Sequence, residues 1–242
     1  MVQLLEYVSR VAPGVLAAVV LLVCVPRELA GLRLAVHVGL FMVLRDGMTP
    51  VGLWRVASRG VWLTHEPVAL LALAAACGWL ALGTFRLEPR LSQRITWLRG
   101  HVVRALSLGL VGGCVIAAPA MLLGWLTPSA AVGGGRSAFS LVALFVFSLV
   151  GNAYEELLFR GFLQELVAER VGAARAAWIA GLAFAFGHAP LAVAVTDVGA
   201  PLLIFTAYEG LICAQLARRC GLASAIAAHG LGIFFVAASS TL

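Results

Sequence analysis

Long apolar runs constrain the fold of this chain more than any other feature of its sequence. An apolar stretch of about 20 residues can cross the hydrocarbon core of a bilayer as an α-helix. The runs are Val11–Val25, Leu29–Leu44, Pro67–Phe85, Val102–Leu126, Ala138–Phe159, Ala176–Thr196, Pro201–Leu216 and Leu222–Ser239. The sequence therefore predicts an all-α, polytopic transmembrane bundle of about eight spans, or seven if one of the first two runs does not cross.

The composition also indicates a surface covered by lipid. Of the 242 residues, 62% are hydrophobic and 12% are charged, whereas a soluble domain carries about 25% charged residues. A chain of this length fits one domain. We therefore expect residues 1–242 to form a single membrane domain, with the lipid bilayer as its surroundings.

Arginine supplies all the basic side chains, because the chain contains no lysine. Together with the heavy use of alanine, valine, leucine and glycine, this favours a bacterial source and hence the inner membrane. With eight spans, twelve arginines fall on one side and five on the other, so the positive-inside rule predicts that the first side is cytoplasmic. No basic face is interleaved with exposed aromatic residues, so we expect no nucleic-acid partner.

Two adjacent glutamates lie late in the run Ala138–Phe159, in the segment NAYEELLFRG that begins at residue 152. Charged residues inside membrane spans are costly and tend to mark function. Glu156 and Arg160 are four residues apart, so they are neighbours on a helix and can pair. Glu155 points about 100° away from Glu156. The spacing predicts Glu156 and Arg160 as a supporting pair and Glu155 as a general base. The alternative is that both glutamates contact headgroups at a helix end.

Two histidines follow in later apolar runs. His188 lies in the segment FAFGHAP, where Pro190 is expected to break or kink the helix. His229 lies in SAIAAHGLG, among small residues that allow another helix or a substrate to approach closely. A single buried histidine is more often structural, but the three segments together favour one shared site. The other histidines, His37, His65 and His101, are expected to be structural.

In this order, the three segments resemble the motifs of the CPBP family, which comprises the type II CAAX prenyl endopeptidases and their bacterial relatives, including Abi-like proteins. That family carries E-E-x-x-x-R, F-x-x-x-H and H-x-x-x-N on membrane helices. Here the first motif is matched by Glu155, Glu156 and Arg160, the second by Phe184 and His188, and the third by His229. The resemblance covers about residues 138–240, which it implies to be the catalytic core.

The resemblance implies an intramembrane endopeptidase that cuts a membrane-tethered protein or peptide near the cytoplasmic face, for maturation, sorting or processing of a C-terminal tail. It implies that Glu155, helped by His188, activates a water. Glu156 and Arg160 would hold the site together, and His229 would face the developing oxyanion.

One position departs from the family pattern. Ile233 stands where the family has an asparagine that, with the histidine of the third motif, stabilises the oxyanion. The loss of one such donor can lower a rate by about 10²–10³. The chain has a single asparagine, Asn152, in a different run, so we expect no nearby residue simply to replace the missing one; a backbone N–H is another candidate donor.

A zinc site is the nearest chemical alternative. Glu155, His188 and His229 include the residue types of a catalytic zinc site, but the chain has no HExxH motif. The resemblance favours a glutamic-type reaction with no metal and no cofactor. The five cysteines form no CxxC motif and are expected to be small, buried apolar side chains.

Two functions from other classes remain as alternatives. A non-catalytic membrane protein, such as a bacteriocin-immunity or scaffolding factor, is favoured by the absence of the family asparagine. A small transporter could use Glu155 and Glu209 as proton relays, although no inverted repeat is visible. Apart from that role, Glu209 is expected to form hydrogen bonds within the bundle or to contact substrate.

Overall fold

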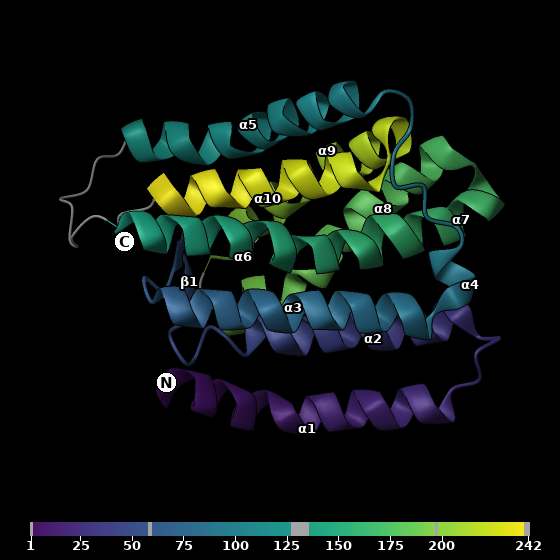
Figure 1. Ribbon diagram of the computed structural model, residues 1–242, viewed down its shortest axis with the longest axis horizontal. Coiled ribbons are helices and arrows are strands. Elements are labelled where there is room, and N and C mark those ends of the chain that lie inside the picture. The colour runs from purple at the N-terminus through teal and green to yellow at the C-terminus, as the bar shows by residue number, and fades with distance from the viewer. Residues whose placement is uncertain (1, 58–59, 127–135, 197, 240–242) are drawn as a thin grey trace.

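The computed structural model describes residues 2–57, 60–126, 136–196 and 198–239. In these ranges helices dominate, and the long ones lie side by side along the longest axis of the molecule (Figure 1). The elements are α1 (Val2–Cys24), α2 (Ala30–Asp46), β1 (Trp54–Ala57), β2 (Gly60–Leu63), α3 (Pro67–Leu87), α4 (Pro89–Ser92), α5 (Val102–Leu126), α6 (Ala138–Glu156), η1 (Leu157–Leu163), α7 (Gln164–Val171), α8 (Ala173–Gly187), η2 (Leu191–Val195), α9 (Ala200–Cys220) and α10 (Leu222–Ser239).

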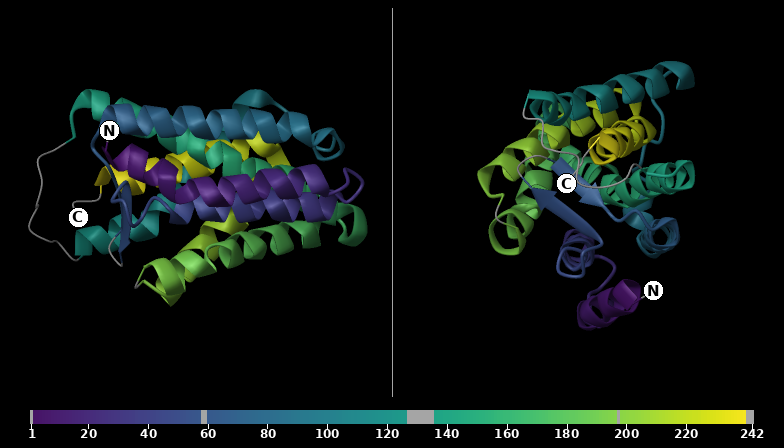
Figure 2. Two further views of the ribbon diagram at one scale, coloured as in Figure 1. Left: turned by 90° about the horizontal axis from the view of Figure 1, so that it is seen from below. Right: turned by 90° about the vertical axis from the view of Figure 1, so that its left-hand side faces the viewer.

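Seven helical segments of the described residues are long and apolar enough to cross a membrane. They confirm the predicted polytopic helical bundle, at the lower of the two expected numbers of spans. The eighth expected span, Leu29–Leu44, corresponds to α2, which is not among the seven. α2 has only 17 residues and carries Arg33, Arg45 and Asp46, and each charge makes insertion of a helix more costly. The helix runs alongside α1 (Figures 1 and 2).

A short antiparallel hairpin joins α2 to α3, and the sequence did not predict it. Trp54 of β1 lies opposite Leu63 of β2. Arg136 donates to the carbonyl groups of Leu63 and Thr64, at 2.5 and 3.0 Å, and thereby ties the hairpin to the start of α6. Each strand has only four residues, which is too short for a recognisable alternation of apolar and polar positions.

The helices of the first and second motifs differ from the expected runs in length and in winding. The expected span Ala138–Phe159 continues through the π-helical segment η1 into α7. α8 ends at Gly187, just before His188 and Pro190, and η2 follows as a second π-helical segment. Wider π turns are frequent at functional sites, and here η1 directly follows Glu155 and Glu156 while η2 begins three residues after His188.

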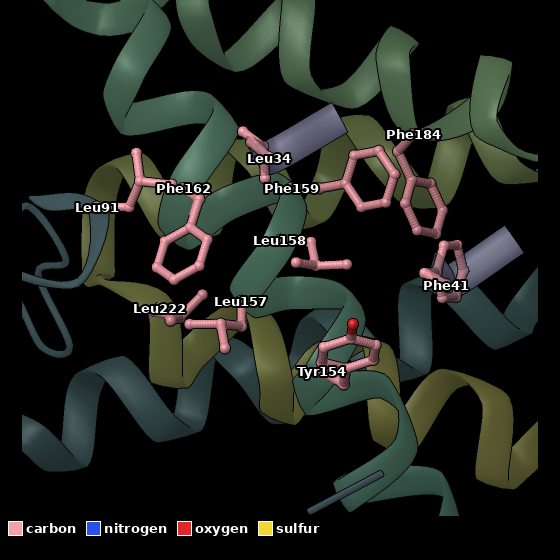
Figure 3. Close-up of a cluster of buried hydrophobic side chains, with 10 residues drawn as sticks. All are labelled: Leu34, Phe41, Leu91, Tyr154, Leu157, Leu158, Phe159, Phe162, Phe184 and Leu222. Atoms are coloured by element: carbon pink, nitrogen blue, oxygen red, sulfur yellow. The ribbon is translucent and has the colours of Figure 1, made fainter. Parts of the chain in front are cut away.

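The largest cluster of buried apolar side chains surrounds η1 (Figure 3). Leu157, Leu158, Phe159 and Phe162 all come from this segment. Phe159 meets the ring of Phe184 edge-on, with the centroids 5.2 Å apart. Since aromatic pairs prefer this geometry, the cluster positions η1 firmly in the centre of the bundle.

Small residues let the helices that carry the candidate residues approach closely. A Cβ atom added to Gly210 of α9 would lie 2.6 Å from the Gly181 carbonyl oxygen of α8. One added to Gly230 of α10 would lie 2.9 Å from Leu149 Cα of α6. The small residues beside His229 therefore permit the close helix approach that the sequence predicted.

The cysteine expectation was wrong for Cys24 and Cys114, which are exposed. Cys213 and Cys220 are buried, and Cys77 is intermediate. In a membrane bundle the outer helix faces are as apolar as the interior, so an apolar run does not distinguish a side chain facing lipid from one facing the core.

Candidate active site

One cavity of about 580 Å³ is lined by side chains from most of the bundle. Its ionisable lining residues include Arg45, Glu155, His188, Glu209 and His229. Most of the remaining lining is apolar and comes from α1, α2, the hairpin, α3 and α9. Ligand sites have volumes of about 300–1,000 Å³ and combine apolar walls with a few convergent polar groups, and this cavity has both properties.

Glu155 lies in the last turn of α6 and faces the cavity. Among the described residues its carboxylate has no hydrogen-bond or ion-pair partner within bonding distance. The carboxylate is therefore available to a water or to a substrate group in the cavity.

Glu156 points away from Glu155 and is fully buried. Its Oε1 atom accepts from Arg160 Nη1 at 2.6 Å and from His229 Nδ1 at 2.8 Å. Arg160 also donates from Nη2 to the Gly210 carbonyl, and its guanidinium lies 4.4 Å from the centre of the Phe184 ring. These contacts link η1 to α8, α9 and α10. A buried charge pair of this kind holds its geometry because breaking it would leave an uncompensated charge.

His188 follows the end of α8, and its ring is oriented by the preceding turn. Its Nδ1 atom lies 2.8 Å from the Phe184 carbonyl oxygen. A carbonyl only accepts, so Nδ1 carries the proton in this bond. Nε2 is then the ring nitrogen that can accept a proton from a group in the cavity.

His229 lies between two carboxylates. Its Nδ1 atom donates to Glu156 Oε1, and its Nε2 atom lies 3.5 Å from Glu209 Oε1. Glu209 is buried and lines the cavity, so it belongs to the site, although its sequence context favoured an ordinary bundle contact. The signal that could have identified it is the position of an acid within an apolar run.

Asn152, the single asparagine of the chain, lines the same cavity as Ile233. Asn152 lies three residues before Glu155 and therefore shares its helix face. Its Nδ2 atom donates one hydrogen to the Ser148 carbonyl at 2.7 Å, and an amide nitrogen carries two.

Arg45 is a further cavity residue that sequence reasoning missed. It directly follows the predicted run Leu29–Leu44. It lies in the last turn of α2 and is buried. Its Nη2 atom donates to the Gly187 carbonyl, next to His188.

The donor atoms in the described part of the chain fit a metal ion poorly. Among the described residues, the possible ligand atoms of Glu156, Cys213 and His229 all lie within 4.8 Å of one another. The zinc alternative instead named Glu155, His188 and His229, which do not form such a group. Glu156 and His229 are bonded to each other, and Glu156 also binds the guanidinium of Arg160. A cation at this position would face that positive charge at close range.

Residues 137–235 match the protein family described as Type II CAAX prenyl endopeptidase Rce1-like. The chain therefore carries an Rce1-like domain over these residues. The Rce1-like domain contains both glutamates, Arg160, both candidate histidines and Glu209, whereas α1, α2, the hairpin and α3 precede it. A domain of this family implies a protease with a protein substrate. Comparisons with curated proteins and with solved structures gave no match.

Proposed function

We propose that this protein is an intramembrane endopeptidase that cuts a membrane-tethered protein or peptide, in maturation or in processing of a C-terminal tail, with a glutamate-activated water. The observation that carries the proposal is that Glu155, His188 and His229, from separate helices, line one cavity of a membrane bundle. In this proposal, residues 1–242 act as one membrane domain and residues 138–240 are its catalytic core.

The first step uses Glu155 and His188. A water between the Glu155 carboxylate and His188 Nε2 loses a proton to Glu155 as its oxygen attacks the carbonyl carbon of the peptide bond. His188 orients this water through the nitrogen that its bond to Phe184 leaves without a proton. When the tetrahedral intermediate collapses, the C–N bond breaks and the proton on Glu155 passes to the leaving amine.

The negative oxygen of the intermediate requires hydrogen-bond donors. His229 can supply one from Nε2 when its ring is protonated, because Nδ1 is bound to Glu156. Asn152 can supply another from its second amide hydrogen, on the cavity wall that also contains Ile233. Asn152 would then act from α6 where the family pattern uses a residue of the last helix.

The cavity position supports cleavage in the half of the bundle nearest the hairpin. The lining residues of α9 come from the half of this helix that lies at this end (Figure 1), those of α1 come mostly from its first two thirds, and those of α3 come from its middle. The arginine-rich links lie at the opposite end, which the positive-inside rule assigns to the cytoplasm. This arrangement differs from the expected cut near the cytoplasmic face.

A non-catalytic role, as an immunity or scaffolding factor, is the second candidate. It is favoured by the apolar side chain of Ile233 within the cavity, at the position of a polar family residue. In that case the buried charges serve only to hold the bundle together.

Substrate trapping in the source cell separates the two candidates. Membranes from cells carrying wild type, Glu155→Gln and Glu66→Gln are compared by mass spectrometry for uncut membrane-tethered proteins. Glu66 is exposed at the start of α3 and lies outside the cavity, so it is the matched control. A discrete precursor that accumulates only with Glu155→Gln supports the protease. Identical protein profiles with all three chains, at equal expression, would reject it in favour of the non-catalytic role.

A further inference from the structure

Glu209 is a buried acid that the proposed reaction does not use. It lies in α9, only 2% of its surface is exposed, and it lines the same cavity as Glu155 and His229. An ionised side chain inside a membrane bundle is costly unless it has a partner of opposite charge. The cations around Glu209 therefore indicate what this acid does.

The two arginines of the site are engaged with other acids. Arg45 pairs with the aspartate that follows it in the chain, and Arg160 pairs with Glu156 at 2.6 Å. Among the ion pairs of the described residues, neither guanidinium pairs with Glu209. The partner of Glu209 is instead the ring of His229, whose Nε2 atom lies 3.5 Å from Glu209 Oε1.

Both ring nitrogens of His229 therefore face a carboxylate. Nδ1 lies 2.8 Å from Glu156 Oε1, and Nε2 faces Glu209. A neutral imidazole has one N–H group and one lone pair, so a neutral ring would turn its lone pair toward one of the two carboxylates. An imidazolium presents an N–H group to each of them. The two carboxylates thus favour the charged form of the ring.

The two contacts of the ring differ in kind. The Nδ1 contact has the length of a charge-assisted hydrogen bond, about 2.7–2.9 Å. The Nε2 contact is longer, and Glu209 Oε1 forms no hydrogen bond to any described residue. Glu209 therefore compensates the charge of the His229 ring without binding its Nε2 hydrogen. That hydrogen remains available to an oxygen atom in the cavity.

The packing of α9 fixes the position of Glu209. The residue before it, Tyr208, donates from its hydroxyl group to the Val115 carbonyl at 2.8 Å. The residue after it, Gly210, lies at the close crossing with α8. The backbone on both sides of the acid is therefore anchored, which keeps its carboxylate beside His229.

We propose that Glu209 is a positioning residue that keeps His229 in its charged form, so that a charged donor offsets the amide donor that is absent at Ile233. This inference rests on the proposed function and deepens it, because it explains how the site can work with an apolar side chain at that position. A hydrogen bond from a charged donor is about twice as strong as one between neutral groups. Glu209 acts on the reaction through His229.

Solid-state NMR measures the charge of the His229 ring directly. The full chain carries isotopically labelled histidine, is reconstituted in lipid at neutral pH, and is assigned by comparison with a His229→Gln chain. We expect both ring nitrogens to carry a proton in wild type, and one of them to lose it in Glu209→Gln. Glu66→Gln removes an exposed carboxylate outside the cavity and should keep both protons. An unprotonated nitrogen in the wild-type ring would overturn the proposal, whether or not any Glu209 variant folds.

A coupling to Ile233 separates the positioning role from a general loss of stability. Glu209→Gln should lower the single-turnover cleavage rate of a trapped precursor by about tenfold or more and leave its affinity unchanged. In a chain that also carries Ile233→Asn, the same substitution should cost about threefold or less, because the added amide also stabilises the oxyanion. Equal losses in the two chains would overturn the proposal, since a purely structural defect lowers both rates alike.

These outcomes can be separated from those of the proposed function. If a precursor accumulates with Glu155→Gln in cells but the wild-type His229 ring has an unprotonated nitrogen, the protease stands and the role of Glu209 fails. If the ring is charged only in the presence of Glu209 but no precursor accumulates, the control of the ring charge stands and the proteolytic function fails.

Discussion

At the scale of single residues, the two adjacent glutamates have opposite surroundings. Glu156 is bound by Arg160 and by His229, whereas Glu155 faces the cavity without a bonded partner. This difference follows from the turn angle between consecutive helical residues. The pair Glu156–Arg160 therefore contributes mainly to stability, and the proposed role of Glu155 is in the reaction itself.

Substitutions at these two positions should separate stability from activity. Arg160→Met leaves the buried Glu156 carboxylate without its cation, which should destabilise the bundle by about 3–5 kcal/mol and also abolish cleavage. Glu155→Gln should abolish cleavage and leave the thermal unfolding midpoint of the detergent-purified protein within a few degrees of wild type. Differential scanning fluorimetry measures both variants. An unfolding midpoint for Arg160→Met equal to that of wild type would contradict the assigned supporting role.

The position of Ile233 gives a second prediction at this scale. Ile233→Asn adds an amide donor to the cavity wall and should raise the cleavage rate of a trapped substrate by about tenfold or more. Asn152→Leu removes the proposed donor from α6 and should lower the rate by about 10². Single-turnover cleavage of the precursor identified by trapping provides the measurement. If Asn152→Leu cleaves at the wild-type rate, another donor stabilises the oxyanion.

At the scale of elements, close helix crossings determine where the candidate residues meet. α8 and α9 cross at Gly181 and Gly210, so that the backbones approach without intervening side chains. This crossing brings the carbonyl of Gly210 within 2.9 Å of Arg160 Nη2. The site therefore depends on glycines that have no chemical role of their own.

A larger residue at that crossing should disrupt the site. Gly210→Val would place its Cβ atom 2.6 Å from the Gly181 carbonyl oxygen, and the strain should destabilise the protein by about 1–3 kcal/mol and reduce cleavage. Gly83→Val is the control in α3, because a Cβ atom there meets nothing within 4 Å. Thermal unfolding and precursor processing are compared for both variants. If the Gly210→Val chain is as stable and active as the Gly83→Val chain, α8 and α9 can move apart at this crossing without disrupting the site.

The helices and the three motif segments could be predicted from sequence because each depends on local spacing. Glu156 and Arg160 are four residues apart, and any regular helix makes them neighbours. Arg45, Asn152 and Glu209 could not be assigned to the site in this way, since their positions in the cavity depend on how α2, α6 and α9 pack. The hairpin was missed because two four-residue strands have too little pattern to recognise.

At the scale of the whole molecule, the two ends of the bundle differ in charge and in structure. The hairpin lies at one end, and α4 and α7 lie at the other (Figure 1). The arginines of the α3–α5 link, including Arg90 and Arg94, belong to the second end. The positive-inside rule therefore predicts that the hairpin lies away from the cytoplasm.

Thiol labelling tests this orientation. Glu66→Cys places a thiol near the hairpin and Arg90→Cys places one on α4, both at exposed positions. The exposed Cys24 and Cys114 are first replaced by alanine. A membrane-impermeant maleimide should label the Glu66→Cys chain in intact cells and the Arg90→Cys chain only after permeabilisation. The reverse pattern would place the cavity on the cytoplasmic side.

The cavity is lined by residues of the Rce1-like domain and by residues that precede this domain in the chain. These two groups of residues can change independently during evolution. The proposed reacting groups come from the Rce1-like domain, whereas much of the apolar wall, together with Arg45, comes from residues that precede it. α1, which contributes a large part of that wall, packs mainly against α2. Its side chains can change without disturbing the Glu156–Arg160–His229 contacts. Under the proposed function, substitutions in the first third of the chain can change which substrate the cavity accepts, while the proposed reacting groups of the Rce1-like domain stay the same.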